Sequence, residues 1–219
     1  MILGIKLDRN GKHERKCTNR KVVQEKRLLR LKIIQIYIKL KTRVQIEVIN
    51  LKRKEKRKID SMEKYFNKSL SALYKEDMKG FQISMLEFDD LNFIDDEGRS
   101  LIFYAVLEGQ FNAVKLLIEK NINLNIRDAN GWTPLHYAVS EHYLEISNLL
   151  IEKGAEVNSK DNFGNTIIWR AVFTSKGRGE IIESLLNHGA NPLIKNDSDI
   201  SALELAKTIG NYDVKQFLL

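Results

Sequence analysis

The sequence predicts an all-α solenoid of helix-turn-helix units with β-turn tips, and three observations lead to this fold class. Asp and Gly bound a four-residue turn at three places 33 residues apart, at residues 95–98, 128–131 and 161–164. Behind each turn, apolar residues follow the i, i+3, i+4 spacing of a helix, twice per period. A fixed period with this content indicates repeated units that bury their apolar faces against one another.

Residues 128–160 contain the local signals for one complete unit. Thr133 is an expected helix N-cap, and Pro134 follows at the first helical position, where its missing N–H costs nothing. Gly154 is expected to end the second helix in a left-handed conformation. The two expected apolar stripes are Leu135, Ala138, Val139 and Ile146, Leu149, Leu150. One such unit cannot bury both stripes alone, so it needs neighbours.

The other units are expected on either side of this one. Residues 62–94 form an N-terminal capping repeat, 95–127 repeat 1, 128–160 repeat 2, 161–195 repeat 3 and 196–219 a C-terminal capping repeat. The end units are expected to be caps because a solenoid needs a polar outer face at each end. Repeat 3 is two residues longer than the others. The extra residues lie in 175–179, which is either a tolerated insertion or a contact loop that presents Lys176 and Arg178.

Residues 1–61 are expected to be a basic, poorly ordered N-terminal extension. Ile34, Ile36, Ile38 and Leu40 alternate with other residues in the period of a strand, but no Gly, Asn or Pro marks a hairpin turn behind them. Three alternatives are open: a solvated tail that need not belong to the native product, an arm for nucleic acid or an anionic membrane, and a folded β-element.

The motifs of the repeated part identify a family. Thr133–His136 has the sequence TPLH, and the units end in GA-x-V/P-N at residues 154–158 and GAN at residues 189–191. With the 33-residue period, the chain over residues 62–219 resembles the ankyrin repeat family. This resemblance implies a stack of helix pairs that binds other proteins without catalysis. Weaker features near the C-terminus are similar to those of bacterial solitary ankyrin proteins, some of which are toxin immunity proteins.

The charge is divided between two parts of opposite sign. Residues 1–58 hold 20 of the 36 basic and 5 of the 29 acidic residues, which leaves 16 basic and 24 acidic residues for the rest. The net charge of +7 therefore divides into +15 and −8. Cys17 is the only cysteine, so no intramolecular disulfide forms, and no apolar run has the length of a membrane span. These features predict a cytoplasmic protein, and the array is expected to be a monomer.

No pattern in the sequence predicts catalysis, a cofactor or a metal site. His136 lies in the TPLH motif, where the resemblance implies a structural role in bonding turn backbone. His13, His142 and His188 have no partner at ligand spacing. No phosphate-binding glycine loop or activated nucleophile is recognisable. The chain is therefore not expected to be an enzyme.

The resemblance implies a protein-binding site on the concave face, made by the turn tips and the inner side of each first helix. The residues carried over by register, together with the inserted loop, are Asp96, Glu97, Arg99, Leu107, Glu108, Asn130, Trp132, Ser140, Glu141, Asn162, Phe163, Asn165, Phe173, Thr174, Lys176 and Arg178. The acidic members and the charge of −8 predict a basic protein partner. Trp132 and Phe163 are either exposed contact residues or side chains folded over the next turn.

Overall fold

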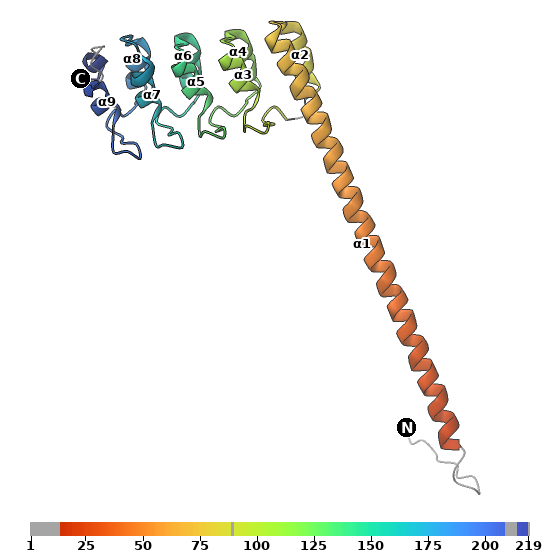
Figure 1. Cartoon of the computed structure of the whole chain (residues 1–219). Helices are drawn as coiled ribbons and strands as arrows, with labels where there is room; N and C mark the ends of the chain where they lie inside the picture. The colour runs from red at the N-terminus through yellow and green to blue at the C-terminus, as the bar shows by residue number, and fades with distance from the viewer. Residues whose placement is uncertain (1–13, 89, 209–213, 219) are drawn as a thin grey trace. The chain divides into compact units, whose positions relative to one another are not determined.

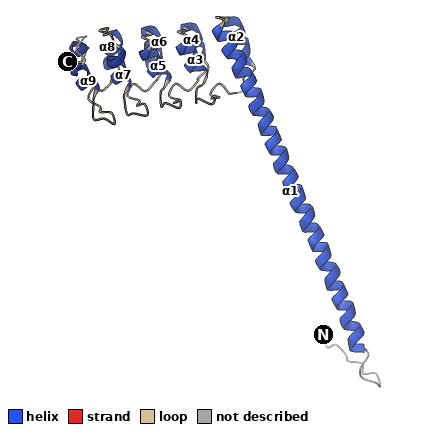
Figure 2. Ribbon diagram, viewed as in Figure 1, coloured by secondary structure: helices blue, strands red, loops and turns tan. Residues whose placement is uncertain are grey.

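The computed structural model describes residues 14–88, 90–208 and 214–218. Within these residues all regular elements are helical (Figures 1 and 2). They are α1 (Glu14–Tyr74), α2 (Met78–Leu86), α3 (Leu101–Leu107), α4 (Phe111–Glu119), α5 (Pro134–Ser140), α6 (Leu144–Glu152), α7 (Ile167–Thr174), α8 (Glu180–Asn187), α9 (Ala202–Thr208) and a 3₁₀ turn η1 (Val214–Phe217). The predicted all-α solenoid is confirmed.

The chain divides into two units, Met1–Lys58 and Ile59–Leu219. In the first unit, residues 14–58 are helical, so the alternative of a folded β-element is wrong for these residues. The range Glu14–Tyr74 contains no Gly or Pro to end a helix. The misleading alternation has a simple cause. Residues i and i+2 lie on nearly opposite sides of a helix, so alternating apolar residues give two apolar faces instead of one sheet face.

The second unit consists of helix pairs arranged side by side, with the turns projecting on one side of the row (Figure 1). The pairs are α3 with α4, α5 with α6 and α7 with α8. The first helices contact one another in the order α3, α5, α7, α9, and the second helices in the order α4, α6, α8. Each apolar stripe is therefore covered by its own pair and by the neighbouring pairs.

The core of the stack is formed by the predicted stripes. Leu135, Ala138 and Val139 of α5 are fully buried, and Leu150 of α6 lies against them in the same cluster. The second helix of each pair ends as expected, since Gly154 and Gly189 adopt positive φ values of 96° and 83°. In repeat 1, Asn121 takes this position with φ 58°, because Asn tolerates the left-handed region better than most residues.

The caps close both ends of the stack. At the N-terminal end, Phe66 of α1 and Phe81 of α2 are buried. The sequence predicts a helix start at residues 76–77, and Asp77 indeed caps α2 by accepting a hydrogen bond from the Gly80 N–H at 2.9 Å. The spacing of Met78, Phe81, Met85 and Leu86 predicts one apolar stripe, but Leu86 is exposed. At the C-terminal end, Ala206 and Val214 are buried. The sequence also predicts a turn at Gly210-Asn211, and these residues lie outside the described part of the chain.

Among the described residues, none of the helices combines the length and the apolar character needed to cross a bilayer.

Candidate functional site

The turn tips are built by one aspartate per repeat. In Asp95, Asp128 and Asp161, the Oδ1 atom accepts hydrogen bonds from the backbone N–H groups two and four residues later, at 2.9 to 3.0 Å. A glycine with φ between 74° and 76° closes each of these turns. In the C-terminal cap, Asn196 takes the place of the aspartate and makes the same two contacts. The turns are therefore fixed in shape before any partner binds.

Backbone hydrogen bonds join the turn tips into one continuous row. The Ala129 N–H donates to the Glu97 carbonyl at 2.9 Å, and the Asn162 N–H donates to the Asn130 carbonyl at 3.1 Å. The Asp197 N–H donates to the Phe163 carbonyl, also at 3.1 Å. The structure thus brings together four residues that the sequence predicted for the binding face, Glu97, Asn130, Asn162 and Phe163.

The second carboxylate oxygen of each turn aspartate faces the first helix. Asp95 and Asp128 receive hydroxyl groups there, from Tyr104 at 2.5 Å and Tyr137 at 2.6 Å. Burial, followed by the bond to Asp128, raises the pKa of Tyr137 to about 12. In repeat 3 the corresponding residue is Arg170, whose guanidinium lies 3.2 Å from Asp161. The third turn therefore contains an ion pair where the first two have hydroxyl bonds.

Arg170 of repeat 3 also packs against Trp132 of the preceding repeat, repeat 2. Its guanidinium carbon lies 4.5 Å from the centre of the Trp132 ring, within cation–π range. On its own repeat, the Trp132 ring lies 4.8 Å from the Tyr137 ring and 6.0 Å from the His136 ring. Trp132 is half-buried. Its ring therefore packs against side chains of α5 and α7.

Phe163 and Phe173 differ from Trp132 because they project into solvent. The exposed fraction is 70% for Phe163 and 57% for Phe173. Phe173 stacks on Trp169 with a centroid separation of 5.4 Å and an angle of 13° between the rings. The Phe163 backbone is held at both sides, since its N–H donates to Asp161 at 2.9 Å and its carbonyl accepts from Asp197. Both rings therefore stand exposed on a fixed backbone.

His136 is buried and neutral. The Thr133 backbone N–H donates to its Nδ1 atom at 3.0 Å, which places the ring proton on Nε2. Burial is the main reason that its pKa falls to about 4. The contact to Thr133 is within the same repeat, and Nε2 has no hydrogen-bond partner among the described residues. The expected bond to an adjacent turn is therefore replaced by a local one.

The predicted site residues divide by exposure. Asp96, Glu97, Glu108, Asn130, Glu141, Asn162, Phe163, Phe173, Lys176 and Arg178 are exposed, and Arg99, Leu107, Trp132, Ser140 and Thr174 are half-buried. Asn165 is the exception, with only 7% of its surface exposed. Its side chain bonds Asp161 at 3.0 Å and Asn196 at 2.7 Å. Asn165 joins two turns, so its prediction as a partner-contacting residue is corrected.

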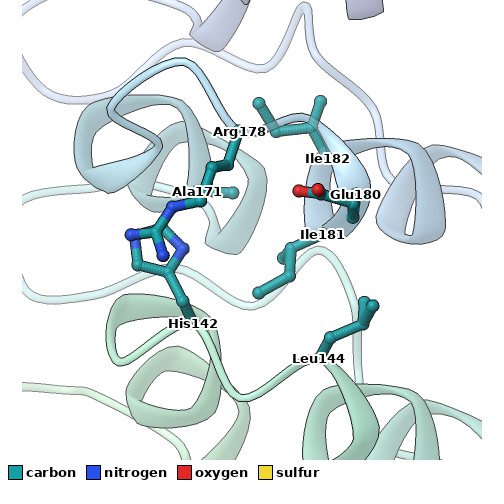
Figure 3. A pocket seen from close by; sticks show the side chains of 7 residues that line it. All are labelled: His142, Leu144, Ala171, Arg178, Glu180, Ile181 and Ile182. Atoms are coloured by element: carbon teal, nitrogen blue, oxygen red, sulfur yellow. The ribbon is translucent and has the colours of Figure 1, made fainter.

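A pocket of about 250 Å³ lies between the α5–α6 and α7–α8 connections. Figure 3 shows its lining residues: His142, Leu144, Ala171, Arg178, Glu180, Ile181 and Ile182. The His142 Nε2 lies 2.6 Å from the Thr174 carbonyl, and this contact joins the two connections. Arg178 lies in the segment that the sequence interpreted as either a tolerated insertion or a contact loop, and it borders a pocket with an apolar base.

Sequence reasoning missed the residues that brace the turns. Arg99 donates to the Tyr137 hydroxyl at 2.9 Å and lies 3.5 Å from Asp128, so it links two repeats. Arg99 was predicted only as a partner-contacting residue, and Arg170 and Tyr137 were not identified at all. A usable signal was present, because Tyr104, Tyr137 and Arg170 all lie nine residues after a turn aspartate.

Comparisons with known proteins agree with this geometry. A family model described as ankyrin repeats in three copies matches residues 70–161, and a model of the single ankyrin repeat matches residues 163–197. No curated protein matches the chain. The two matched ranges together cover more than half of the chain, and they include α2 to α8.

Proposed function

The chain belongs to the ankyrin repeat family, and we propose on that premise that its repeat unit is a non-catalytic binding surface for a basic protein. Ankyrin repeats are protein–protein interaction modules. The proposed surface is the concave face made by the turn tips and the inner sides of α3, α5 and α7. We propose that it acts in the cytoplasm as a monomer.

The exposure of Phe163 and Phe173 is the observation that supports this surface. Large exposed aromatic rings on a fixed backbone lose little conformational freedom on binding, and residues of this type often contribute most of an interface's binding energy. Arg170 lies 5.8 Å from the Phe173 ring and 4.5 Å from the Trp132 ring. Phe173 of repeat 3 and Trp132 of repeat 2 therefore form an aromatic centre around this guanidinium.

The charge around this centre supports a basic partner. Asp96, Glu97, Glu108 and Glu141 are exposed on repeats 1 and 2, and the part of the chain after residue 58 has a balance of −8. Opposite charges accelerate association and exclude partners of like charge. The on-rate for the partner should therefore fall as salt rises.

The biological role proposed for this binding is neutralisation of the partner, as a regulator or a bacterial immunity protein. It is supported by the C-terminal similarity to bacterial solitary ankyrin proteins and by the acidic, aromatic face. Co-expression with the product of a neighbouring toxin gene tests it. Restored growth with the wild type, but not with Phe163→Ser/Phe173→Ser, is expected. Equal toxicity in the presence and absence of the wild-type chain would reject the immunity role.

The binding surface itself is tested by comparing three tagged full-length chains. Proteins captured by the wild type, by Phe163→Ser/Phe173→Ser and by the control Leu193→Ser are quantified, and the partner that emerges is purified for titration. Leu193 is 63% exposed, so the control changes an exposed apolar residue outside the proposed face. The double variant should weaken binding by about thirtyfold or more. Equal affinity of all three chains would place the surface elsewhere.

We also propose a second candidate function for α1, in which it tethers the repeat unit to an anionic membrane or a nucleic acid. Residues 22–58 contain 13 basic and 3 acidic residues. The large apolar side chains from Val22 to Leu51 are 44% to 66% exposed. Cationic side chains attract phosphates of either surface, whereas exposed aliphatic side chains favour lipid.

This second candidate predicts that the full chain sediments with anionic vesicles and that residues 59–219 do not. Neutral vesicles are the control for charge, and single-stranded DNA is the competing ligand. Binding to DNA with a steep salt dependence, but not to vesicles, would assign α1 to nucleic acid. Absence of binding to both would remove the tether.

A further inference from the structure

We propose that the pocket between the α5–α6 and α7–α8 connections is a subsite for an aliphatic side chain flanked by a carboxylate. The protein partner of the proposed function would contribute this segment, so the inference rests on that function. Three features of repeat 3 support it: the reversed charge of its inserted loop, the fixed shape of that loop and the apolar base of the pocket.

The inserted loop reverses the charge that the other two connections have. Exposed glutamates, Glu108 and Glu141, follow α3 and α5, whereas the connection after α7 has Lys176 and Arg178. In the described part of the chain, no carboxylate forms an ion pair with either of these two residues. This loop therefore offers a partner's carboxylate two cations without an ion-pair partner, and Arg178 is the one that lines the pocket.

The loop has a defined shape although it is exposed. Lys176 and Gly177 adopt consecutive positive φ values of 49° and 87°. The Arg178 N–H donates to the Ser175 carbonyl at 3.0 Å, and the Ser175 hydroxyl donates to the Val172 carbonyl at 2.9 Å. At the other end, a Cβ on Gly179 would collide with the Phe217 ring. The pocket wall is thus formed in advance, which lowers the entropic cost of binding.

The base of the pocket suits an aliphatic side chain. Ala171, Ile181 and Ile182 are buried core residues that reach it from α7 and α8, and Leu144 adds a partly buried side chain from α6. A cavity of about 250 Å³ exceeds the volume of several waters, since each takes roughly 30 Å³ in the liquid. One leucine or isoleucine side chain of a partner can occupy it.

The rim orients the bound segment. Figure 3 shows Arg178 and His142 on one side of the pocket and Glu180 on the other. The guanidinium attracts the carboxylate of the segment, while Glu180 repels it, so the acidic residue lies on the Arg178 side. Because the exposed glutamates of repeats 1 and 2 favour basic residues, the acidic end of the partner segment is expected at repeat 3. The face therefore imposes a direction on the segment.

In the test, short peptides are titrated into the full chain, and binding is monitored by the chemical shifts of the backbone amides. The probes are acetylated and amidated Asp-Leu, Lys-Leu and Asp-Ser dipeptides, at concentrations up to about 10 mM because contacts of this size bind in the millimolar range. The Asp-Leu peptide should shift the amide signals of Gly177, Gly179 and Ile181 until they saturate, and the other two peptides should leave these signals unchanged. The double variant Lys176→Gln/Arg178→Gln should bind the Asp-Leu peptide with about tenfold lower affinity. Lys115→Gln, an exposed site on α4, should have no effect.

Three results would overturn the proposal. They are the absence of a saturable shift at these amides, an equal response to Lys-Leu or Asp-Ser, and unchanged binding by Lys176→Gln/Arg178→Gln. Failure here is separable from failure of the proposed function. The Phe163→Ser/Phe173→Ser chain should bind the Asp-Leu probe like the wild type even though it loses the protein partner.

Discussion

At the scale of single residues, each turn aspartate and its partner nine residues later stabilise the fold through a contact that can be located in the sequence. Each aspartate accepts two backbone N–H hydrogen bonds and at least one hydrogen bond from a side chain. For Asp161, burial alone would raise the pKa. The hydrogen bonds from Asn165 and the backbone, with Arg170, outweigh burial and lower that pKa. The ionised form is therefore the one that the fold stabilises.

Replacing Arg170 by Met should destabilise the fold by about 2 kcal/mol. The change removes the ion pair with Asp161, whose side chain is fully buried, and the cation–π contact with Trp132. Urea unfolding measures the loss. Arg178→Met is the matched control, and it should change stability by less than about 0.5 kcal/mol because the residue is exposed. Similar values for the two variants would show that the Arg170 contacts contribute nothing.

His136 should make stability depend on pH between about 6.5 and 4. Its pKa is about 4 in the folded state and about 6.5 when unfolded, so in this window the unfolded chain binds the proton first. Stability is fully present above the unfolded pKa and falls as pH drops toward 4, by up to about 3 kcal/mol. Unfolding free energies measured across this window give the slope. His136→Gln should flatten it, and an unchanged slope would assign the dependence to other groups.

At the scale of elements, the α7–α8 connection shows how one insertion is accommodated. Gly179 has an ordinary φ of −104°, so its requirement is steric and arises from the Phe217 ring of η1. Gly154 is the opposite case. Its φ is 96°, and nothing lies within 4 Å of the position where a Cβ would stand. The inserted loop and the C-terminal cap therefore depend on each other.

Gly179→Ala should cost about 1 to 2 kcal/mol, because the Phe217 ring has to move aside. In a Phe217→Ala background the same substitution should cost much less, since the clash is gone. Gly154→Ala gives the cost of positive φ alone, about 1 kcal/mol. Thermal unfolding of the four variants measures the coupling. A Gly179→Ala cost that persists without the Phe217 ring would show that the loop backbone needs glycine for another reason.

At the scale of the whole molecule, stability comes from neighbouring pairs. α9 covers α7, and the Leu203 N–H donates to the Pro192 carbonyl at 3.1 Å. Removing residues 196–219 should expose the buried side chains of α7, such as Ile168 and Val172, and cause loss of cooperative melting or aggregation. Circular dichroism and size-exclusion chromatography report both effects.

The matched truncation removes residues 1–58 and should leave the melting temperature unchanged. Among the residues that the structure describes, those of the hydrophobic core lie after residue 58. A C-terminal truncation that melts as sharply as the full chain would contradict a nearest-neighbour stack. Unfolding of residues 59–219 would show that the repeat unit needs α1 as a whole.

The sequence by itself determined the repeated part of the fold. Turn glycines, Thr133, Pro134 and the apolar periodicity act within a few residues of one another, so the helix pairs and their order are local properties. Asn121 and Asp199 stand where the equivalent positions of other repeats have glycine, and both adopt the positive φ that those glycines have. Residues 14–58 were misinterpreted because alternating apolar residues fit both a strand and a helix with two apolar faces.

Only the tertiary structure decided which of the predicted side chains are exposed and which are packed. Trp132 lies four residues and Phe163 two residues after its turn aspartate, yet Trp132 is covered by Arg170 and Phe163 stands in solvent. The difference depends on a residue 38 positions beyond Trp132, which no local pattern connects to it. Asn165 likewise became a turn-to-turn link because Asn196 approaches it across the stack. Exposure depends on contacts between repeats, whereas the helices and turns depend on contacts within them.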